Sequence, residues 1–470
     1  MNERRTYDPT VRASVEHELK LDLDTSFSLP ELPGAELEAR TFTSTYHDTP
    51  ARSLGRAGIT LRRRVENGKS LWQLKLPRNG DTGLARTEIE EPGGPAGPPA
   101  ALARLLAAHL RHGKLEPVAT LRTRRSGVRV LDGERALADV TVDTVDVLDA
   151  GRAAGGFAEI EIELVDGDEA DLKRLGKTLR RAGARVSDGR PKLMRVLELP
   201  DAPSSSDPLA RMLEAQLRAL ETHDPGIRLG DDPEDVHKFR VATRRARALI
   251  RATRPLLGDT LAPVAAELRW LAGLLGPVRD LDVLIAHLGT QVAALGEDEP
   301  AGRELVAGLS AQRDAAQDEL LAALSSTRYG ELLALFEHAI RGLPRLEPDA
   351  VRGIARDELA KLRKATRKLP RDPDDDELHR VRIKAKRARY AAELAGAERV
   401  VDALKKVQDV IGEHQDAVVA EARLRTLARA KTAIAAGRLI ELERARRHAM
   451  RARAPEVIAA AIAAGAKAFS

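Results

Sequence analysis

Polar and apolar residues alternate along much of the chain up to about residue 200. In the stretch SVEHELKLDLD at 14–24, Glu16, Glu18 and Lys20 take every second position, and leucines take the other parity. A period of two is that of a β-strand, whose side chains point alternately to opposite faces. The pattern predicts a strand with one charged face and one apolar face.

Similar segments recur between turns in this part of the chain. They are 41–49, 59–65, 70–77, 85–91, 136–147 and 157–165. Two other stretches, 101–112 and 169–183, have the periodicity of helices. The pattern predicts a mainly antiparallel β domain with inserted helices.

The second half of the chain has a different pattern. Residues 199–208, LPDAPSSSDP, have the Pro, Ser and Asp content of a linker. Beyond them Ala, Leu, Arg and Glu follow helical periodicity, which predicts an all-α domain. We therefore expect an α+β protein of two domains, at 13–199 and 209–465, with a linker at 200–208.

The helical half contains an internal repeat. Residues 233–251 align with 375–393 at an offset of 142, and residues 268–282 align with 404–418 at an offset of 136. Two similar helical bundles about a pseudo-two-fold axis are expected from such a duplication. We place the repeats at about 209–345 and 350–465.

Composition narrows the class of protein. The 470 residues include no cysteine, which rules out disulfides and thiolate metal sites and fits a reducing compartment. We see no signal-peptide pattern and no run of eighteen apolar residues, so we expect a soluble cytoplasmic protein without a membrane partner. The net charge is only +5 and aromatic residues make up 3%, so a basic surface would suit phosphates better than nucleobases.

The charged faces of the predicted strands suggest a shared site. If the sheet closes into a barrel with the charged parity inside, unpaired charges there would be costly. Phosphates would neutralise the bases, and a divalent cation would neutralise the carboxylates. An open sheet with surface salt bridges is the alternative.

The motifs EHELK, YHDTP, ITLRRR, WQLK, ARTEIE, EIEIEL and SDGRPKL occur in this order between residues 13 and 199. Together they resemble the CYTH superfamily, also called triphosphate tunnel metalloenzymes. The resemblance implies an eight-stranded antiparallel tunnel that binds a triphosphate with Mg²⁺ or Mn²⁺. Members of the family include inorganic triphosphatases, thiamine triphosphatases, RNA triphosphatases and class IV adenylyl cyclases.

The resemblance also implies roles for individual residues. The catalytic residues would be Glu16, Glu18 and Lys20, and the metal ligands Glu16, Glu18, Asp143, Glu161 and Glu163, with Glu90 and Glu159 as further acids. The triphosphate would be held by Lys20, Arg62, Arg64, Lys75, Arg86 and Lys192, together with Arg124 or its neighbour in parity, Arg122. Metal-assisted hydrolysis of this kind needs positioning and charge stabilisation rather than a nucleophilic side chain.

Basic residues recur at helical spacing in both repeats of the second half. His237, Arg240, Arg244 and Arg247 lie on one face of a predicted helix, and Arg251 continues the stripe. The second repeat recreates it with His379, Arg382, Lys386 and Arg389. Each stripe alone could be a solvated helix face, but two pseudo-symmetric stripes could line one groove for a polyanion.

This doubled H-x-x-R-x-x-x-[RK]-R-x-R pattern resembles the CHAD domain, the conserved histidine α-helical domain, over about residues 205–465. The resemblance implies binding of inorganic polyphosphate. The binding residues would be His237, Arg240, Arg244, Arg247, His379, Arg382, Lys386 and Arg389, with Arg269, Lys405 and Lys406 as additions. We assign His414 no role.

We therefore expect a Mg²⁺-dependent inorganic triphosphatase, with Mn²⁺ as an alternative metal, whose helical domain binds polyphosphate. The expected location is the cytoplasm, with association to polyphosphate granules as a further expectation. Alternatives are an organic triphosphatase acting on thiamine triphosphate, an adenylyl cyclase, and a non-catalytic polyphosphate-binding protein. Nucleic-acid binding by the Arg-rich helices is disfavoured but would show a similar dependence on salt.

Overall fold

We describe the protein from a computed structural model, which places residues 13–24, 27–78, 85–111, 113–197, 199, 205–370 and 372–469. The chain divides into two compact units, Met1–Pro203 and Ser204–Ser470. The division falls within the segment 200–208 expected as a linker, of which residues 200–204 lie outside the described part.

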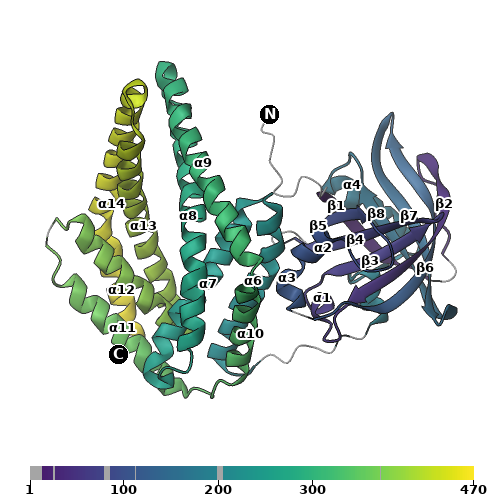
Figure 1. Ribbon diagram of the computed structural model, residues 1–470, viewed down its shortest axis with the longest axis horizontal. Coiled ribbons are helices and arrows are strands. Elements are labelled where there is room, and N and C mark those ends of the chain that lie inside the picture. The colour runs from purple at the N-terminus through teal and green to yellow at the C-terminus, as the bar shows by residue number, and fades with distance from the viewer. Residues whose placement is uncertain are drawn as a thin grey trace. The chain divides into compact units, whose positions relative to one another are not determined.

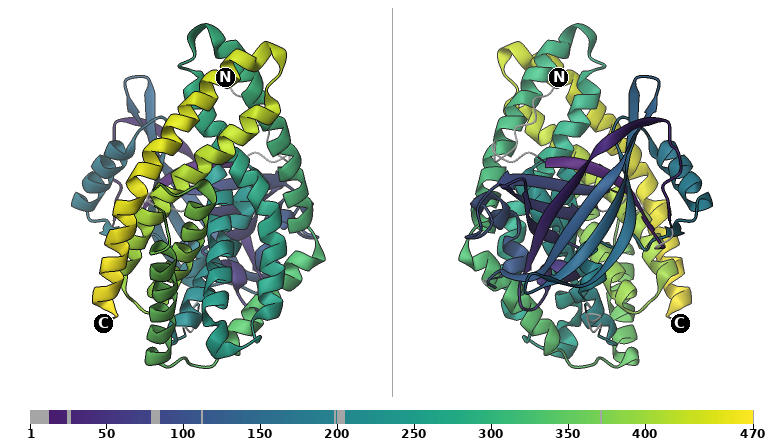
Figure 2. Two further views of the ribbon diagram at one scale, coloured as in Figure 1. Left: turned by 90° about the vertical axis from the view of Figure 1, so that its left-hand side faces the viewer. Right: turned by 90° about the vertical axis from the view of Figure 1, so that its right-hand side faces the viewer.

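The first unit is built on an antiparallel sheet that closes into a barrel (Figures 1 and 2). Its strands are β1 (Ala13–Asp22), β2 (Gly34–Asp48), β3 (Thr60–Glu66), β4 (Lys69–Pro77), β5 (Ala85–Pro92), β6 (Glu116–Asp132), β7 (Arg135–Asp149), β8 (Arg152–Leu164) and β9 (Arg185–Val186). The sheet order is β5-β4-β3-β2-β6-β7-β8-β1-β9, and β1 also pairs with β5. Strands β1 to β8 therefore form a closed ring, which confirms the expected eight-stranded antiparallel barrel.

Tight turns set the register of the hairpins. Strands β3 and β4 pair from Glu66 opposite Lys69, so only Asn67 and Gly68 form the turn between them. Their φ angles are 48° and 73°. Asn and Gly adopt this left-handed backbone readily, and such two-residue turns match the twist of the flanking strands.

The apolar parity of the strands faces outward against a helix. Leu21 of β1 and Ile160 and Ile162 of β8 are buried in one cluster with leucines of α4 (Glu169–Arg181). The helix approaches closely at Gly176, where an added Cβ would lie 2.6 Å from Cδ2 of Leu19. This confirms the expectation that the charged parity points into the barrel.

The described part of the first unit also contains four shorter helices. They are α1 (Ser53–Arg56), α2 (Ala100–Leu105), α3 (Ala107–Leu110) and α5 (Lys192–Val196). Leu193 and Met194 of α5 pack with Tyr46, Leu121 and Val145 in a core cluster of the barrel. The apolar packing of α5 places Lys192, its first residue, among the charged side chains of the barrel.

The second unit is helical (Figure 1). Its α-helices are α6 (Pro208–Leu229), α7 (Pro233–Leu257), α8 (Ala262–Val292), α9 (Glu299–Leu324), α10 (Thr327–Arg341), α11 (Pro348–Thr366), α12 (Asp375–Leu394), α13 (Glu398–Leu427) and α14 (Ala433–Ala468). Two short 3₁₀ segments, Gly296–Asp298 and Ala430–Thr432, precede α9 and α14.

The same order of helix contacts occurs in both repeats. Helices α6 to α9 each contact the next along the chain, and so do α11 to α14. The repeats meet through α7 and α12 and through a shared apolar cluster from α8, α9, α13 and α14. In the helices of the described residues, we find none that is both long and apolar enough to span a bilayer.

Candidate functional site

The barrel encloses a charged cavity of about 200 Å³. Strands β1, β3, β4, β5 and β8 supply most of its walls, because alternate side chains on each strand point inward. The lining residues are Glu16, Glu18, Lys20, Arg40, Tyr46, Thr60, Arg62, Arg64, Gln73, Lys75, Arg86, Glu88, Glu90, Arg125, Glu161, Glu163, Pro191 and Lys192.

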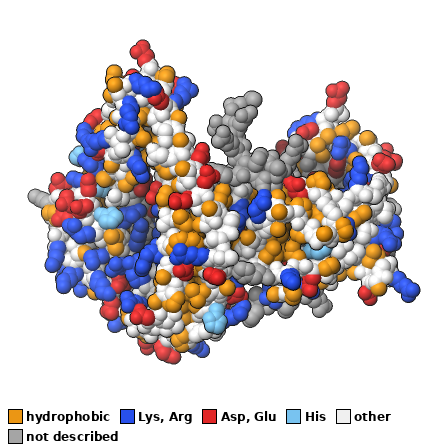
Figure 3. Space-filling model, in the orientation of Figure 1, with side chains coloured by type: hydrophobic (Ala, Val, Ile, Leu, Met, Phe, Trp, Pro, Cys, Tyr) orange, Lys and Arg blue, Asp and Glu red, His pale blue; other side chains and the backbone are white. Residues whose placement is uncertain are grey.

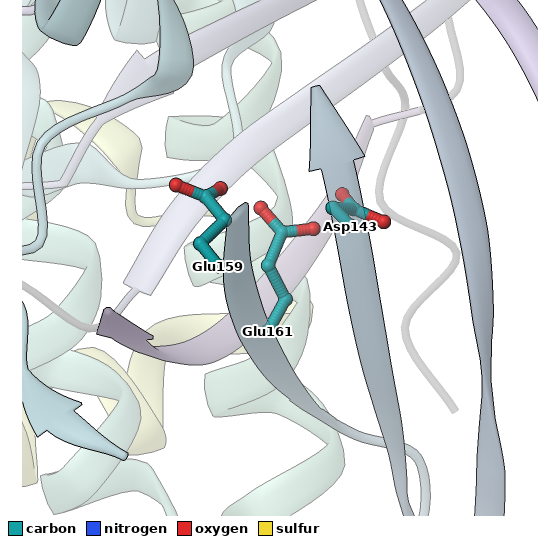
Figure 4. A group of neighbouring side chains, drawn as sticks. All are labelled: Asp143, Glu159 and Glu161. Atoms are coloured by element: carbon teal, nitrogen blue, oxygen red, sulfur yellow. The ribbon is translucent and has the colours of Figure 1, made fainter. Parts of the chain in front are cut away.

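Three carboxylates converge beside this cavity (Figure 4). Asp143 lies on β7, Glu159 and Glu161 lie on β8, and one oxygen from each lies within 4.8 Å of the others. Asp143 and Glu159 are fully buried. Carboxylate oxygens are the preferred ligands of Mg²⁺ and Mn²⁺, so this acid cluster fits a divalent cation.

The acid cluster is neutralised by cationic side chains. Nζ of Lys192 lies 2.9 Å from Asp143, 2.6 Å from Glu159 and 2.6 Å from Glu161. Arg125 donates to both oxygens of Asp143 at 2.7 and 2.6 Å and also contacts Glu161. The acid cluster and these two cations thus offset one another's charge, as buried charges require.

The pKa shifts follow from this pairing. Burial opposes ionisation of Glu161, but Lys192, Lys20 and Arg125 outweigh it and hold its pKa well below the usual range. Burial likewise opposes the charge of Lys192, yet Glu161, Asp143 and Glu159 hold its pKa well above the usual range. Both groups are therefore charged at neutral pH.

A second group of acids lies on β1 and β5. Burial raises the pKa of Glu88 to about 8, and a hydrogen bond to Glu16 adds to the rise. Nζ of Lys75 contacts Glu16 and lies 3.6 Å from Glu88. At neutral pH the pair Glu16 and Glu88 therefore shares a proton beside Lys75.

Arg62 is held by two neutral side chains. Its Nε donates to Oε1 of Gln73 at 2.7 Å, and Nη1 donates to the hydroxyl of Tyr46 at 3.2 Å. Gln73 in turn donates to Glu90. This chain of hydrogen bonds fixes the guanidinium where it faces the cavity.

The helical unit has a second cavity, of about 400 Å³, between α7, α11 and α12. Its cations are Arg244, Arg247 and Arg251 of α7 with Lys386 and Arg387 of α12, and its other walls are Ala248, Ala252, Glu358, Ile383 and Tyr390. Figure 3 shows Lys and Arg side chains gathered on this unit around α12. We call this cavity the basic groove.

Like charges crowd the basic groove. Burial lowers the pKa of Lys386 to about 7, and Arg382, Arg244, Arg240 and Arg389 lower it further. Nε atoms of Arg244, Arg382 and Arg389 are buried without a hydrogen-bond partner. An anion in the groove would relieve the repulsion between these cations.

Family comparisons match both halves of the chain. The CYTH domain family matches residues 12–188, and the CHAD domain family matches residues 211–425. An uncharacterized protein of Mycobacterium tuberculosis is 34% identical over 463 residues, covering 88% of this chain and 89% of that protein. The chain belongs to the CYTH–CHAD proteins.

Two further relatives each match one half. Human thiamine-triphosphatase is 30% identical over 216 residues, covering 42% of this chain and 89% of that enzyme. The crystal structure of the CHAD domain from the plant Ricinus communis is 27% identical, covers 57% of this chain and 94% of its own, and has a TM-score of 0.44. The order CYTH then CHAD is the order expected from the motifs.

The CYTH cavity brings together most of the residues expected there. Those lining it are Glu16, Glu18, Lys20, Arg62, Arg64, Lys75, Arg86, Glu90, Glu161, Glu163 and Lys192. Asp143 and Glu159 lie in the adjoining acid cluster. Their assignment to substrate and metal remains a proposal.

Arg124 does not line the CYTH cavity. Its side chain is 56% exposed and lies 3.4 Å from Asp146, whereas its neighbour Arg125 lines the cavity. Arg122 is exposed as well. The run of arginines offered both parities, and a bulge between Val130 and Leu131 shifts the β6–β7 register so that Arg125 faces Asp143.

The CHAD residues expected to bind polyphosphate fall into three groups. Arg244, Arg247 and Lys386 line the basic groove. The pKa of Lys386 is lowered by the charges of Arg240, Arg382 and Arg389, and the pKa of Arg247 is lowered by the charge of Arg269. His237, His379, Lys405 and Lys406 are not among the groove's lining residues. Nδ1 of His379 lies 3.0 Å from Gln415, and Lys405 lies 3.1 Å from Asp402.

Sequence reasoning missed some residues of both sites. Glu88 of the CYTH cavity was on the expected inward parity but received no role, and Arg125 was passed over for Arg124. In the groove, Arg387 and Tyr390 join the stripe residues. Each follows a stripe residue by one position, so the spacing of the stripe does not select it, and both line a cavity that α12 forms with α7 and α11.

Proposed function

We propose that the CYTH domain hydrolyses inorganic tripolyphosphate with a divalent cation, Mg²⁺ or Mn²⁺, and that the CHAD domain binds inorganic polyphosphate. The observation that carries the first part is the enclosed cavity that combines several lysines and arginines with the acid cluster. A linear triphosphate carries several negative charges and needs both the cations and, through a metal, the carboxylates.

The cavity walls favour an inorganic substrate over an organic one. Among the described residues that line it, Tyr46 is the only aromatic, and its hydroxyl is engaged with Arg62. Trp72 is fully buried on the outer face of β4, where it lies against His47 and donates to the carbonyl of Gly94. Neither ring offers a free face on which thiamine or adenine could stack.

Each part of the site has a distinct task in hydrolysis. Arg62, Arg64, Lys75 and Arg86 hold the phosphate chain and offset charge that builds on its oxygens. Asp143, Glu159 and Glu161 would hold the divalent cation, which when bound polarises phosphate oxygens and acidifies water. Lys20, Glu88 and Lys192 are buried in the cavity walls, and removal from bulk solvent strengthens their interactions.

An organic triphosphate is the second candidate. The similarity to human thiamine-triphosphatase covers 89% of that enzyme, which makes thiamine triphosphate the organic compound to test. The two candidate functions predict different orders of hydrolysis rate among the substrates, and both require a metal.

Phosphate release from tripolyphosphate, thiamine triphosphate and ATP, with Mg²⁺ and with EDTA, tests the first part. We expect release to be fastest with tripolyphosphate, abolished by EDTA, and lowered about 100-fold by Glu18→Gln. Glu91→Gln, a change of the same kind on β5 outside the cavity lining, should leave it unchanged. Faster release from thiamine triphosphate would favour the second candidate, and no release from any compound would reject hydrolysis.

Binding of fluorescently labelled long-chain polyphosphate to the full chain tests the second part. Arg247→Gln in the basic groove should weaken binding, whereas Arg303→Gln, an exposed arginine paired with Glu299 on α9, should not. Duplex DNA at equal charge concentration serves as competitor, because salt dependence alone would not separate the two polyanions. Full displacement by DNA would reject polyphosphate specificity.

A further inference from the structure

Lys192 occupies the centre of the acid cluster. Its ammonium lies within 2.9 Å of one oxygen from each of Asp143, Glu159 and Glu161. Among the residues that the structure describes, these are the three carboxylates whose oxygens lie close enough together to bind one cation. The ammonium of Lys192 and a divalent cation would therefore compete for the same three carboxylates.

Charge balance makes this competition strong. The three carboxylates face four cations: Lys20, Arg125, Lys192 and Arg195. Because Lys20 is shared with Glu18 and Arg195 with Asp22, the cluster is close to neutral as it stands. A divalent cation added without other change would leave about two excess positive charges in a buried site, which is costly. A bound metal therefore requires that an ammonium leave or that anions arrive.

Lys192 is the cation whose departure would free all three carboxylates at once. It contacts all three carboxylates, whereas Lys20 contacts Glu161 and lies 3.7 Å from Glu159. Its side chain lines the main cavity as well, beside Pro191 at the start of the five-residue helix α5. A rotation of its flexible side chain could carry the ammonium from the carboxylates toward a ligand in the cavity.

We propose that Lys192 takes the place of the divalent cation in the free protein and moves to the phosphate chain when metal and substrate bind together. This proposal rests on the proposed function of the CYTH cavity. The phosphate anions supply a new partner for Lys192, and its departure frees the carboxylates for the metal. Metal alone therefore binds weakly, and metal and linear polyphosphate strengthen each other's binding by the same factor.

Titration of the full chain with MnCl₂, followed by electron paramagnetic resonance of free Mn²⁺, tests the proposal without any turnover. Lys192→Met should bind Mn²⁺ at least about fivefold more tightly than the wild type when no polyphosphate is present. Arg86→Met is the matched control, because it removes one positive charge from the same cavity but makes no contact with the acid cluster. Asp143→Asn added to Lys192→Met should abolish the tighter binding and so identify the site.

The comparison separates competition for the acid cluster from the general effect of removing one positive charge from the cavity. An equal gain in Lys192→Met and Arg86→Met, or no gain in either, would overturn the proposal. If Lys192→Met and the wild type bind Mn²⁺ equally and the wild type still releases phosphate in a metal-dependent way, the role of Lys192 is rejected and the proposed function stands. Absence of Mn²⁺ binding in every variant, both with and without polyphosphate, would reject both the role of Lys192 and the proposed function.

A measurement on the wild type tests the proposal even if Lys192→Met does not fold. In ¹⁵N-lysine-labelled protein, the ammonium signal of Lys192, assigned by its loss in Lys192→Arg, should shift when diamagnetic Mg²⁺ and non-hydrolysable imidotriphosphate are added together. A signal that stays unchanged while both ligands bind would contradict the displacement.

Discussion

Two neutral side chains hold the guanidinium of Arg62 in the CYTH cavity. The Tyr46 hydroxyl and the Gln73 amide oxygen accept from different nitrogens of Arg62. Neutral acceptors orient the cation without cancelling its charge, so the charge stays available to a phosphate. Tyr46 is therefore a positioning residue within the proposed mechanism.

The Tyr46→Phe variant removes one of these acceptors and little else. We expect kcat/KM for tripolyphosphate to fall about tenfold, because Arg62 loses part of its orientation. Circular dichroism should show an unchanged fold, since the ring itself remains in its core cluster. An unchanged kcat/KM would show that Gln73 alone suffices.

Lys386 should make polyphosphate binding depend on pH. Its pKa of about 7 reflects burial and then the positive charges of Arg382, Arg244, Arg240 and Arg389, and a bound polyanion would raise it. The bound state then holds more protons than the free state, so affinity should increase as pH falls from about 9 to 6.

Lys386→Arg isolates this effect. Arginine stays charged throughout the range, so the variant should lose the part of the pH dependence that comes from residue 386. Titration of His237, whose pKa is lowered by burial and then by Arg279, persists in both proteins and cancels in the comparison. Equal pH profiles for the two proteins, measured by calorimetry with long-chain polyphosphate, would contradict the assignment.

At the scale of elements, the alternation of residues predicted most of the barrel. Strands β1, β3, β4, β5 and β8 lie where the pattern placed them, and the inward parity held for Arg62 and Glu161. β6 was not among the expected strands, since its arginines occupy both parities, and a bulge changes its register. The helix α5 and the place of Lys192 depend on tertiary packing, which period-two reasoning does not contain.

The pairing of β6 with β7 leaves no room at Gly127. An added Cβ there would lie 2.2 Å from the carbonyl oxygen of Val140, a backbone atom that cannot turn away. Gly127→Ala should lower the free energy of unfolding of the barrel by about 1–3 kcal/mol. Gly155→Ala on β8, where nothing lies within 4 Å, is the control and should cost little.

Urea unfolding followed by Trp72 fluorescence measures this change. A Trp270→Phe background restricts the signal to Trp72, which is buried in the CYTH unit. Equal urea midpoints for Gly127→Ala and Gly155→Ala would show that β6 and β7 can move apart enough to accept a methyl group at residue 127.

At the scale of the whole chain, the two CYTH and CHAD units both concentrate charge, but in different ways. The barrel balances acids against bases, whereas α7 and α12 bring arginines together with few acids. The duplication was visible in the sequence as two matching stripes. Their convergence on one groove could only be suggested, because helix packing rather than spacing brings α7 against α12.

This imbalance predicts a conflict between stability and binding. Arg244 lies among Arg240, Arg382 and Lys386, and its Nε has no hydrogen-bond partner. Arg244→Met should raise the thermal midpoint of the CHAD unit by a few degrees and weaken polyphosphate binding at least about fivefold. Arg303→Met, which breaks an exposed pair with Glu299, should do neither. A lower midpoint in Arg244→Met would show that its packing outweighs the repulsion.

Closure of the barrel also sets an order of events during synthesis. Strand β1 is made first, but its partners β5 and β8 are Ala85–Pro92 and Arg152–Leu164. The edge of β1 that pairs with β8 therefore stays unpaired until almost the whole CYTH unit has been translated. Pairing over such sequence separation is slow, and an unpaired strand is open to wrong partners. The charged residues of β1, which face the cavity in the finished barrel, discourage association of nascent chains during that wait.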